Sequence, residues 1–232
     1  MFIGHFAVAL GAKKAAPRTS LGTLVLAAQF ADLLWPVLLL AGLERVRITP
    51  GIMAGTSLDF TDYPISHSLS AVLGWGILVG GLYWIIRRYA RGAWIVGAAV
   101  VSHWVLDLIV HRPDLPVFPA AGPRVGLGLW NSLPATLVVE FALFAVGITL
   151  YVHTTAARDA VGRYSFWAFV ASLGVLYLAS AFGPPPPSVS ALATTSLAGW
   201  LWVIWAYWID RHRETTRDAR RGDRSCAESS SS

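Results

Sequence analysis

The chain has 232 residues, of which 55% are hydrophobic and 13% are charged, and its mean hydropathy is +0.56. A soluble domain carries about 25% charged residues, so this composition excludes an ordinary water-soluble domain, which needs more polar atoms to cover its surface. The net charge of +5 comes from basic residues that flank apolar runs, which is typical of membrane orientation signals, and we expect no binding of nucleic acid.

Residues 1–12 form a short apolar stretch that ends at Lys13 and Lys14. A secretory signal carries its positive charges before the apolar run, whereas here they follow it. The stretch therefore predicts a half-length helix that dips into a helical bundle.

Six longer apolar runs follow, each close to the ~20 residues that a helix needs to cross a hydrocarbon core. None of them alternates apolar and polar residues as a strand of a membrane barrel does. Ser66 suits the N-cap of the second run, and Pro134 suits the first turn of the fourth. The sequence therefore predicts an all-α, polytopic membrane helix bundle over residues 1–210, and a charged, disordered cytoplasmic tail over residues 211–232. The predicted spans are Ser20–Leu43, Ser66–Ile86, Gly92–Val110, Pro134–Val152, Tyr164–Phe182 and Ser188–Ile209.

Several ionisable side chains interrupt these apolar runs, although an Asp at the centre of a span costs about 2.5–3.5 kcal/mol on insertion scales. A cost of this size indicates a function for each group. The helical rise places these groups at similar depths, toward the outer side of the bundle. They are His5 in the half-length helix, Asp32 in the first span, His67 at the start of the second, and His103 and Asp107 in the third.

The third span carries His103, Asp107 and His111 four residues apart, so the three side chains share one helix face. A His and an Asp one turn apart can bind the same metal ion. His103 and His111 are about 12 Å apart along the helix axis, which is too far for one ion to bind both. We therefore expect His111 at the outer mouth of the site, together with Asp62 and Asp114.

Imidazole and carboxylate ligands suit Zn²⁺, Mn²⁺ or Fe²⁺, and we expect zinc. A zinc ion with an open position brings bound water to a pKa of about 7 and polarises a phosphoryl or carbonyl oxygen, which allows hydrolysis without a nucleophilic side chain. Glu140 lies in the middle of the fourth span, where it either orients a ligand histidine or pairs with Asn131 or a serine. The sequence leaves both roles of Glu140 open.

The order of these residues resembles the membrane-bound metal-dependent hydrolase family related to YdjM. The shared pattern is an N-terminal histidine, a span with an Asp before a proline, a (T/S)HS motif that opens a helix, and HxxxD in the next span, all within about residues 1–115. The family often has PDxD where this chain has FADLLWP, so one carboxylate is missing and we expect a single metal ion. The resemblance implies that the metal ligands are His5, Asp32, His67, His103 and Asp107.

The residues around His111 predict the catalytic groups. A general acid or base needs only hydrogen-bond reach of the substrate, and Asp114 can orient the His111 imidazole and raise its pKa toward neutrality. Arg112 can bind a phosphate or carboxylate of the substrate. We therefore expect His111, Asp114 and Arg112 to act on the substrate.

These observations predict a membrane-embedded, metal-dependent hydrolase that acts on an ester or phosphoester of a lipid or lipid-linked substrate. The bilayer is the expected partner, and the location of the protein in the bilayer is the argument for a lipid substrate.

Two other classes of function remain open. One is a transporter or non-catalytic scaffold in which Asp32 and Glu140 relay protons or pack. The other is a haem b electron carrier with His67 and His103 as axial ligands, although an iron porphyrin does not need the neighbouring carboxylates.

The basic residues predict the orientation of the chain. With six spans, 14 of the 18 Lys and Arg residues fall on one side, which the positive-inside rule assigns to the cytoplasm. We therefore expect an integral protein of a bacterial inner membrane with its C-terminus in the cytoplasm.

A labelling experiment tests this orientation. In Pro185→Cys, the new thiol in the loop before the last span should react with a membrane-impermeant maleimide added to intact cells. The native Cys226 in the tail is the matched control, and it should react only after the cells are opened. Labelling in the reverse order would show that the orientation is inverted.

Overall fold

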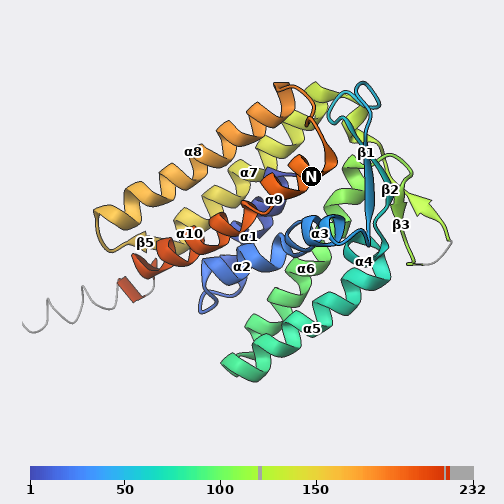
Figure 1. Cartoon of the computed structure of the whole chain (residues 1–232). Coiled ribbons are helices and arrows are strands. Elements are labelled where there is room, and N and C mark those ends of the chain that lie inside the picture. The colour runs from blue at the N-terminus through green and yellow to red at the C-terminus, as the bar shows by residue number, and fades with distance from the viewer. Residues whose placement is uncertain (120–121, 217, 220–232) are drawn as a thin grey trace, which may run out of the picture.

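The computed structural model describes residues 1–119, 122–216 and 218–219, and it confirms the all-α bundle (Figure 1). The apolar runs form helices because a helix pairs its own backbone N–H and C=O groups, which a bilayer core requires. The helices are α1 (Ile3–Ala15), α2 (Leu21–Ala28), α3 (Phe30–Leu40), α4 (Pro64–His67), α5 (Leu69–Arg87), α6 (Ala90–Val110), η1 (Leu129–Asn131), α7 (Leu133–Thr154), α8 (Ala160–Phe182), α9 (Val189–Ser196) and α10 (Gly199–Arg211).

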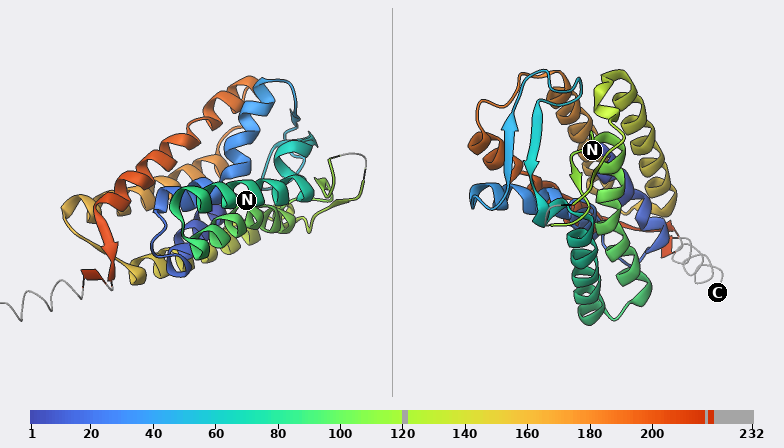
Figure 2. Two further views of the ribbon diagram at one scale, coloured as in Figure 1. Left: turned by 90° about the horizontal axis from the view of Figure 1, so that it is seen from below. Right: turned by 90° about the vertical axis from the view of Figure 1, so that its right-hand side faces the viewer.

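Three antiparallel pairs of short strands lie at the two ends of the bundle (Figure 2). The sheets β1–β2 and β3–β4 occupy one end, which we call the hairpin end, and β5–β6 lies at the opposite end. The strands are β1 (Arg45–Ile48), β2 (Leu58–Asp62), β3 (Leu115–Pro116), β4 (Arg124–Val125), β5 (Thr155–Ala157) and β6 (Arg213–Thr215).

Within the residues that the structure describes, five segments are long and apolar enough to cross a membrane, so the chain is an integral membrane protein. They are α5, α6, α7, α8 and the continuous run Val189–Arg211, which contains α9 and α10. A sixth span requires α2 and α3 together, and these helices are bent by 55° at Gln29. The first predicted span is therefore broken in its middle, and the break places Asp32 in the first turn of α3.

The predicted half-length helix is α1, and it lies in the core of the bundle. Ile3, Ala9 and Leu10 are fully buried, because α1 packs against α2, α6 and α7. The approach to α7 is close at Gly147, where an added Cβ would lie 2.5 Å from the carbonyl oxygen of Ala7. This short helix carries His5 into the interior without crossing the membrane.

Two predicted boundaries differ from the structure. Ser66 is not the N-cap of the second span, because Ser68 accepts the capping hydrogen bond from Ala71 and Ser66 lies in the one-turn helix α4. The predicted disordered tail begins too early, because Arg213–Thr215 form β6 and pair with β5. Residue 217 and residues 220–232 of the predicted tail lie outside the described part of the chain.

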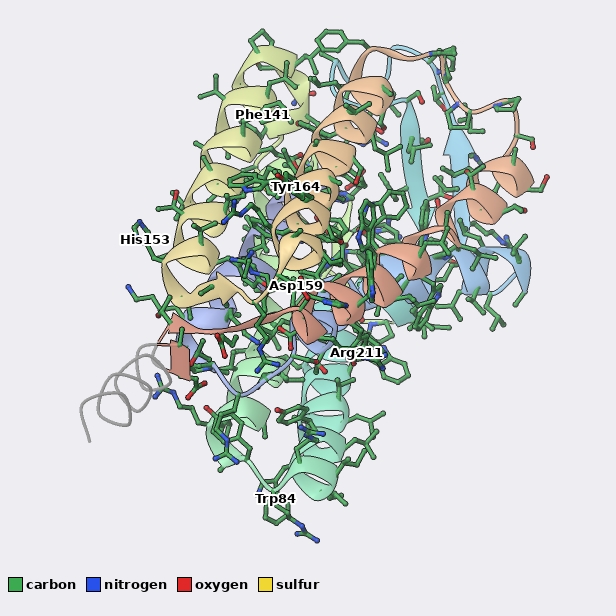
Figure 3. All side chains as sticks on the ribbon, turned by 90° about the vertical axis from the view of Figure 1, so that its left-hand side faces the viewer. Trp84, Phe141, His153, Asp159, Tyr164 and Arg211 are labelled. Carbon is green, nitrogen blue, oxygen red and sulfur yellow. The ribbon has the colours of Figure 1, made fainter. Side chains whose placement is uncertain are left out.

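Basic residues gather at the end of the bundle opposite the hairpins, which we call the basic end. Lys13 pairs with Asp210 at 2.8 Å, and Arg158 lies 3.4 Å from Glu214. Figure 3 shows His153 pointing away from the bundle on α7, and its side chain is exposed. His153 is therefore remote from the core, as expected for a residue at a span end.

Candidate metal centre

Helices α3, α4 and α6 bring four possible metal-ligand atoms close together. His103 Nε2 and Asp107 Oδ2, one turn apart on α6, lie 3.3 Å from each other. His67 Nε2, at the end of α4, lies 3.5 Å from Asp32 Oδ1 and 3.8 Å from Asp107 Oδ2. Asp32 Oδ1, on α3, lies 3.6 Å from His103 Nε2. We call these four residues the His/Asp quartet.

The spacing of these ligand atoms is compatible with metal binding. A tetrahedral zinc site with bonds of about 2.0–2.1 Å separates its ligand atoms by about 3.4 Å. Four of the six separations among these atoms are 3.3 to 3.8 Å. Among the described residues, the ligand atoms that all lie within 4.8 Å of one another form two groups of three, which are Asp32, His67 and His103, and His5, His103 and Asp107. Two carboxylates that share the same two imidazoles in a buried place gain strongly from a cation between them. Either group could therefore hold a divalent metal ion.

His103 is oriented by the break in the first span. Its Nδ1 lies 2.8 Å from the carbonyl oxygen of Ala28, the last residue of α2. A carbonyl oxygen only accepts, so Nδ1 carries the proton and the lone pair of Nε2 is left for the quartet. Among the residues that the structure describes, His103 Nε2 is buried without a hydrogen-bond partner. A buried nitrogen with a free lone pair is available as a metal ligand.

His67 is oriented by a chain of two hydrogen bonds. Ser66 Oγ donates to Glu44 Oε2 at 2.6 Å, and the same oxygen lies 2.6 Å from His67 Nδ1. The hydroxyl has one proton, which is used on Glu44, so His67 Nδ1 must donate to Ser66. The lone pair of His67 Nε2 then faces Asp32 and Asp107.

Glu44 is a site residue that the sequence did not reveal. It is buried, and its Oε1 accepts from the backbone N–H groups of Ile65 at 2.7 Å and Ser66 at 2.8 Å. It lies between α3 and β1, 22 residues before Ser66, and no spacing rule links the two positions. The fold of the hairpin end brings them together.

His5 lies beside the quartet. Its ring stacks on His103 with centroids 3.7 Å apart, and its Nε2 lies 3.2 Å from Asp107 Oδ1. The backbone amino group of Met1 contacts the same carboxylate oxygen at 2.5 Å. The ligand atoms of His5, His103 and Asp107 form a second group within 4.8 Å of one another. His5 thus reaches the site as expected, but on the opposite oxygen of Asp107.

Glu140 has neither of the roles considered from the sequence. Its Oε2 accepts hydrogen bonds from the backbone N–H groups of Phe2 at 2.8 Å and Gly4 at 3.2 Å. These groups belong to the N-terminal end of α1, where the donors are unpaired and the helix dipole is positive. Glu140 therefore anchors the end of α1 that carries His5.

A cavity of about 640 Å³ opens onto the quartet. Asp32, His67 and Asp107 line its inner end, and the Asp32 side chain remains 39% exposed. A structural zinc site is closed, whereas a catalytic one keeps an open side. The quartet is therefore accessible to water and to a ligand.

His111 lines the same cavity, just beyond the end of α6. Its Nδ1 lies 2.9 Å from Asp114 Oδ1, and the Tyr63 hydroxyl lies 3.3 Å from each of these two atoms. The expected orientation of the imidazole by Asp114 is present. The expected rise in pKa is wrong, because burial lowers the pKa of His111 and outweighs the opposite effect of Asp114. His111 is therefore a neutral imidazole at neutral pH, able to accept a proton.

Arg112 is engaged by two carboxylates. Its guanidinium contacts Asp59 Oδ1 at 2.5 Å and Asp114 Oδ2 at 3.0 Å. Arg112 is not one of the described residues that line the 640 Å³ cavity. The expected role in binding a substrate anion is thus replaced by a structural one, since Arg112 holds the carboxylate that orients His111.

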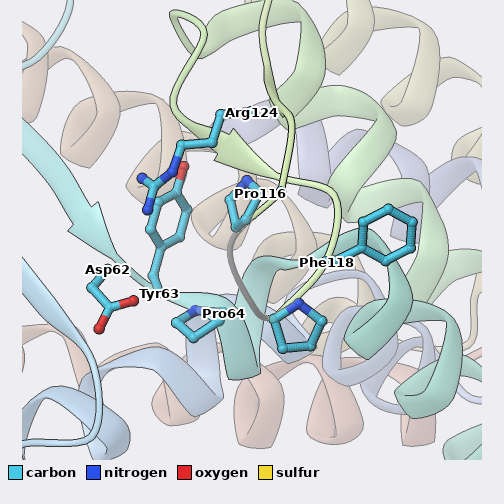
Figure 4. A pocket seen from close by; sticks show the side chains of 8 residues that line it. Asp62, Tyr63, Pro64, Pro116, Phe118 and Arg124 are labelled. Atoms are coloured by element: carbon cyan, nitrogen blue, oxygen red, sulfur yellow. The ribbon is translucent and has the colours of Figure 1, made fainter.

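Asp62, expected at the mouth of the site, belongs to a separate outer cavity of about 330 Å³ (Figure 4). Tyr63, Pro116 and Arg124 also line this outer cavity. Because Tyr63 also contacts His111, its ring is a wall between the outer cavity and the catalytic candidate.

No family model, no curated protein and no solved structure matches the chain. The geometry of the quartet and of its cavity therefore carries the functional argument.

The hydrogen bonds that join Glu44, Ser66 and His67 predict that metal affinity depends on residues that do not bind the metal themselves. Ser66→Ala should weaken zinc binding by about 10–100-fold, because His67 loses the acceptor that fixes its tautomer and ring orientation. Ser66→Thr keeps the hydroxyl and should bind as the wild type does. Competition with a zinc-chelating dye measures both constants. Equal affinities of the Ala and Thr variants would show that the chain has no positioning role.

Proposed function

We propose that the protein is a metal-dependent hydrolase of a bacterial inner membrane that acts on an ester or phosphoester of a lipid or lipid-linked substrate. The observation that carries the proposal is the His/Asp quartet, in which two imidazoles and two carboxylates make four contacts of 3.3–3.8 Å beside an open cavity. Zinc is the proposed ion, and manganese and iron suit the same ligands. The resemblance to the YdjM-related membrane hydrolases, drawn on the same residues, supports the reaction class.

The side chains around the quartet suit hydrolysis. A divalent ion polarises a phosphoryl or carbonyl oxygen and lowers the pKa of a water. His111, oriented by Asp114 on the wall of the same cavity, accepts a proton in the proposed reaction. Ser66 and Glu44 hold His67, and the carbonyl of Ala28 holds His103.

The proposed orientation places the basic end in the cytoplasm, with Lys13 and the C-terminal end of α10 on the same side. The hairpin end then faces outward, and the cavity opens toward the outer half of the membrane. The cavity is lined at this end by Gly55 and Thr56 of the β1–β2 connection, by Leu58 of β2 and by Trp130 of η1.

The metal prediction is that the purified protein carries close to one equivalent of zinc or a similar divalent ion. His67→Ala and Asp107→Asn should each lose it, because the quartet then lacks one ligand. Elemental mass spectrometry measures the metal, and size-exclusion chromatography shows that the variants are folded. A well-folded wild type without metal, isolated from metal-replete cells, would favour the transporter or scaffold, and a haem absorption band would favour the electron carrier.

The catalytic prediction separates ligation from proton transfer. His111→Ala should keep the metal and lose hydrolysis by about 10²-fold or more, which is the usual contribution of a general base. His103→Ala should lose both, and His153→Ala, at an exposed site on α7, should change neither. Metal content and hydrolysis of p-nitrophenyl carboxylate and phosphate esters are measured on the same preparations. If His111→Ala removes the metal as completely as His103→Ala, the assigned roles are wrong.

A further inference from the structure

The cavity that reaches the quartet is also lined by a second set of residues, and we call the part that they bound the α8/α9 arm. These residues come from the C-terminal part of α8, from α9 and from the first turn of α10. They line the same cavity as Asp32 and Asp107. The wall residues include Leu176, Tyr177, Ala181, Leu192, Thr195 and Trp202.

The lining of this α8/α9 arm is mainly apolar, although it also includes the hydroxyl residues Ser180, Thr195 and Ser196. Thr195, a polar residue of the wall, bonds its hydroxyl back to the carbonyl oxygens of Ala191 and Leu192 at 2.8 and 3.0 Å. The hydroxyl proton of Thr195 is therefore donated within α9 and not to the cavity. The Tyr177 ring stacks on Phe2, with centroids 6.0 Å apart, and Phe2 itself lines the cavity near the quartet. Apolar surface therefore continues from the arm toward the metal centre.

The arm also lies next to the lipid-facing surface of the bundle. On the other faces of its wall helices, Val175 of α8 and Leu201 and Ile204 of α10 are exposed, each above 60%. Exposed apolar residues on spanning helices face hydrocarbon. One layer of helix therefore separates the arm from the acyl region of the membrane.

We propose that the α8/α9 arm binds one hydrocarbon chain of the substrate, while the ester or phosphoester of the same molecule lies at the quartet. The reaction at the quartet rests on the proposed function, whereas the binding of the chain does not. A volume of about 640 Å³ lies within the range of pockets that enclose a small molecule. An apolar arm joined to a polar, metal-binding end matches an amphipathic molecule, because a small polar substrate would leave the arm without a partner.

A photoreactive probe tests the proposal without hydrolysis. The probe is a dodecyl phosphonate with a diazirine at the far end of its chain, added to the zinc-loaded full-length protein in detergent micelles. Peptide mass spectrometry should find the label on residues 176–182 and 192–202. Excess dodecyl phosphonate should suppress the labelling, and ethyl phosphonate should not.

Two variants of α8 provide matched controls. Ala181→Trp fills the arm and should reduce labelling by about tenfold, because loss of two buried methylenes already weakens binding by about that factor. Ala179→Trp adds the same side chain at an exposed position that does not line the cavity, and should label as the wild type does. Metal content should be unchanged in both.

The outcomes separate this inference from the proposed function. Label spread over the lipid-facing helices, equal in the two Trp variants, would overturn the chain-binding arm even if p-nitrophenyl esters are hydrolysed. Label in the arm that Ala181→Trp removes would support it even if the protein hydrolyses nothing.

Discussion

Asp107 is the group on which the centre of this structure depends. Its two oxygens contact imidazoles from three segments, His5 on α1, His67 on α4 and His103 on its own helix α6. A carboxylate buried among membrane spans is stable only where charge or hydrogen bonds compensate the loss of water. The half-length helix, the one-turn helix and α6 must therefore meet at one place. The imidazoles and the amino group of Met1 supply such compensation, and a divalent ion could add to it.

Two breaks between helices help to place the residues around Asp107. The break between α2 and α3 leaves a carbonyl for His103 and starts a new helix at Asp32. The separation of α4 from α5 turns Ser66 and His67 toward Glu44 and the quartet. Backbone irregularity inside a membrane is tolerated where it is buried in protein or lines a cavity, and both breaks satisfy this condition. Continuous helices would have placed these polar groups on fixed faces that do not converge.

The surroundings of the quartet are closed on one side and open on the other. Its inner groups are buried and oriented through second contacts, while Asp32 remains open to the cavity. His111 stands on the cavity wall, held through Asp114 by Arg112. Residues of α8 and α9, most of them apolar, line the same cavity. In the proposed complex, a polar reacting group and a hydrocarbon chain occupy this one cavity.

The sequence by itself determined the membrane bundle, because long apolar runs leave helices as the main way to pair backbone groups in lipid. It also identified His67, His103, Asp107 and Asp32, because ionisable residues in such runs are costly and the i, i+4 pair on one face is visible as spacing.

Only the tertiary structure decided which residues from distant segments are in contact. Glu44 meets Ser66 through the packing of the hairpin end, and Glu140 caps α1 from the middle of α7. Arg112 contacts the carboxylates of Asp59 and Asp114. Burial lowers the pKa of His111. Contacts of this kind depend on how the helices pack, which no local pattern of residues specifies.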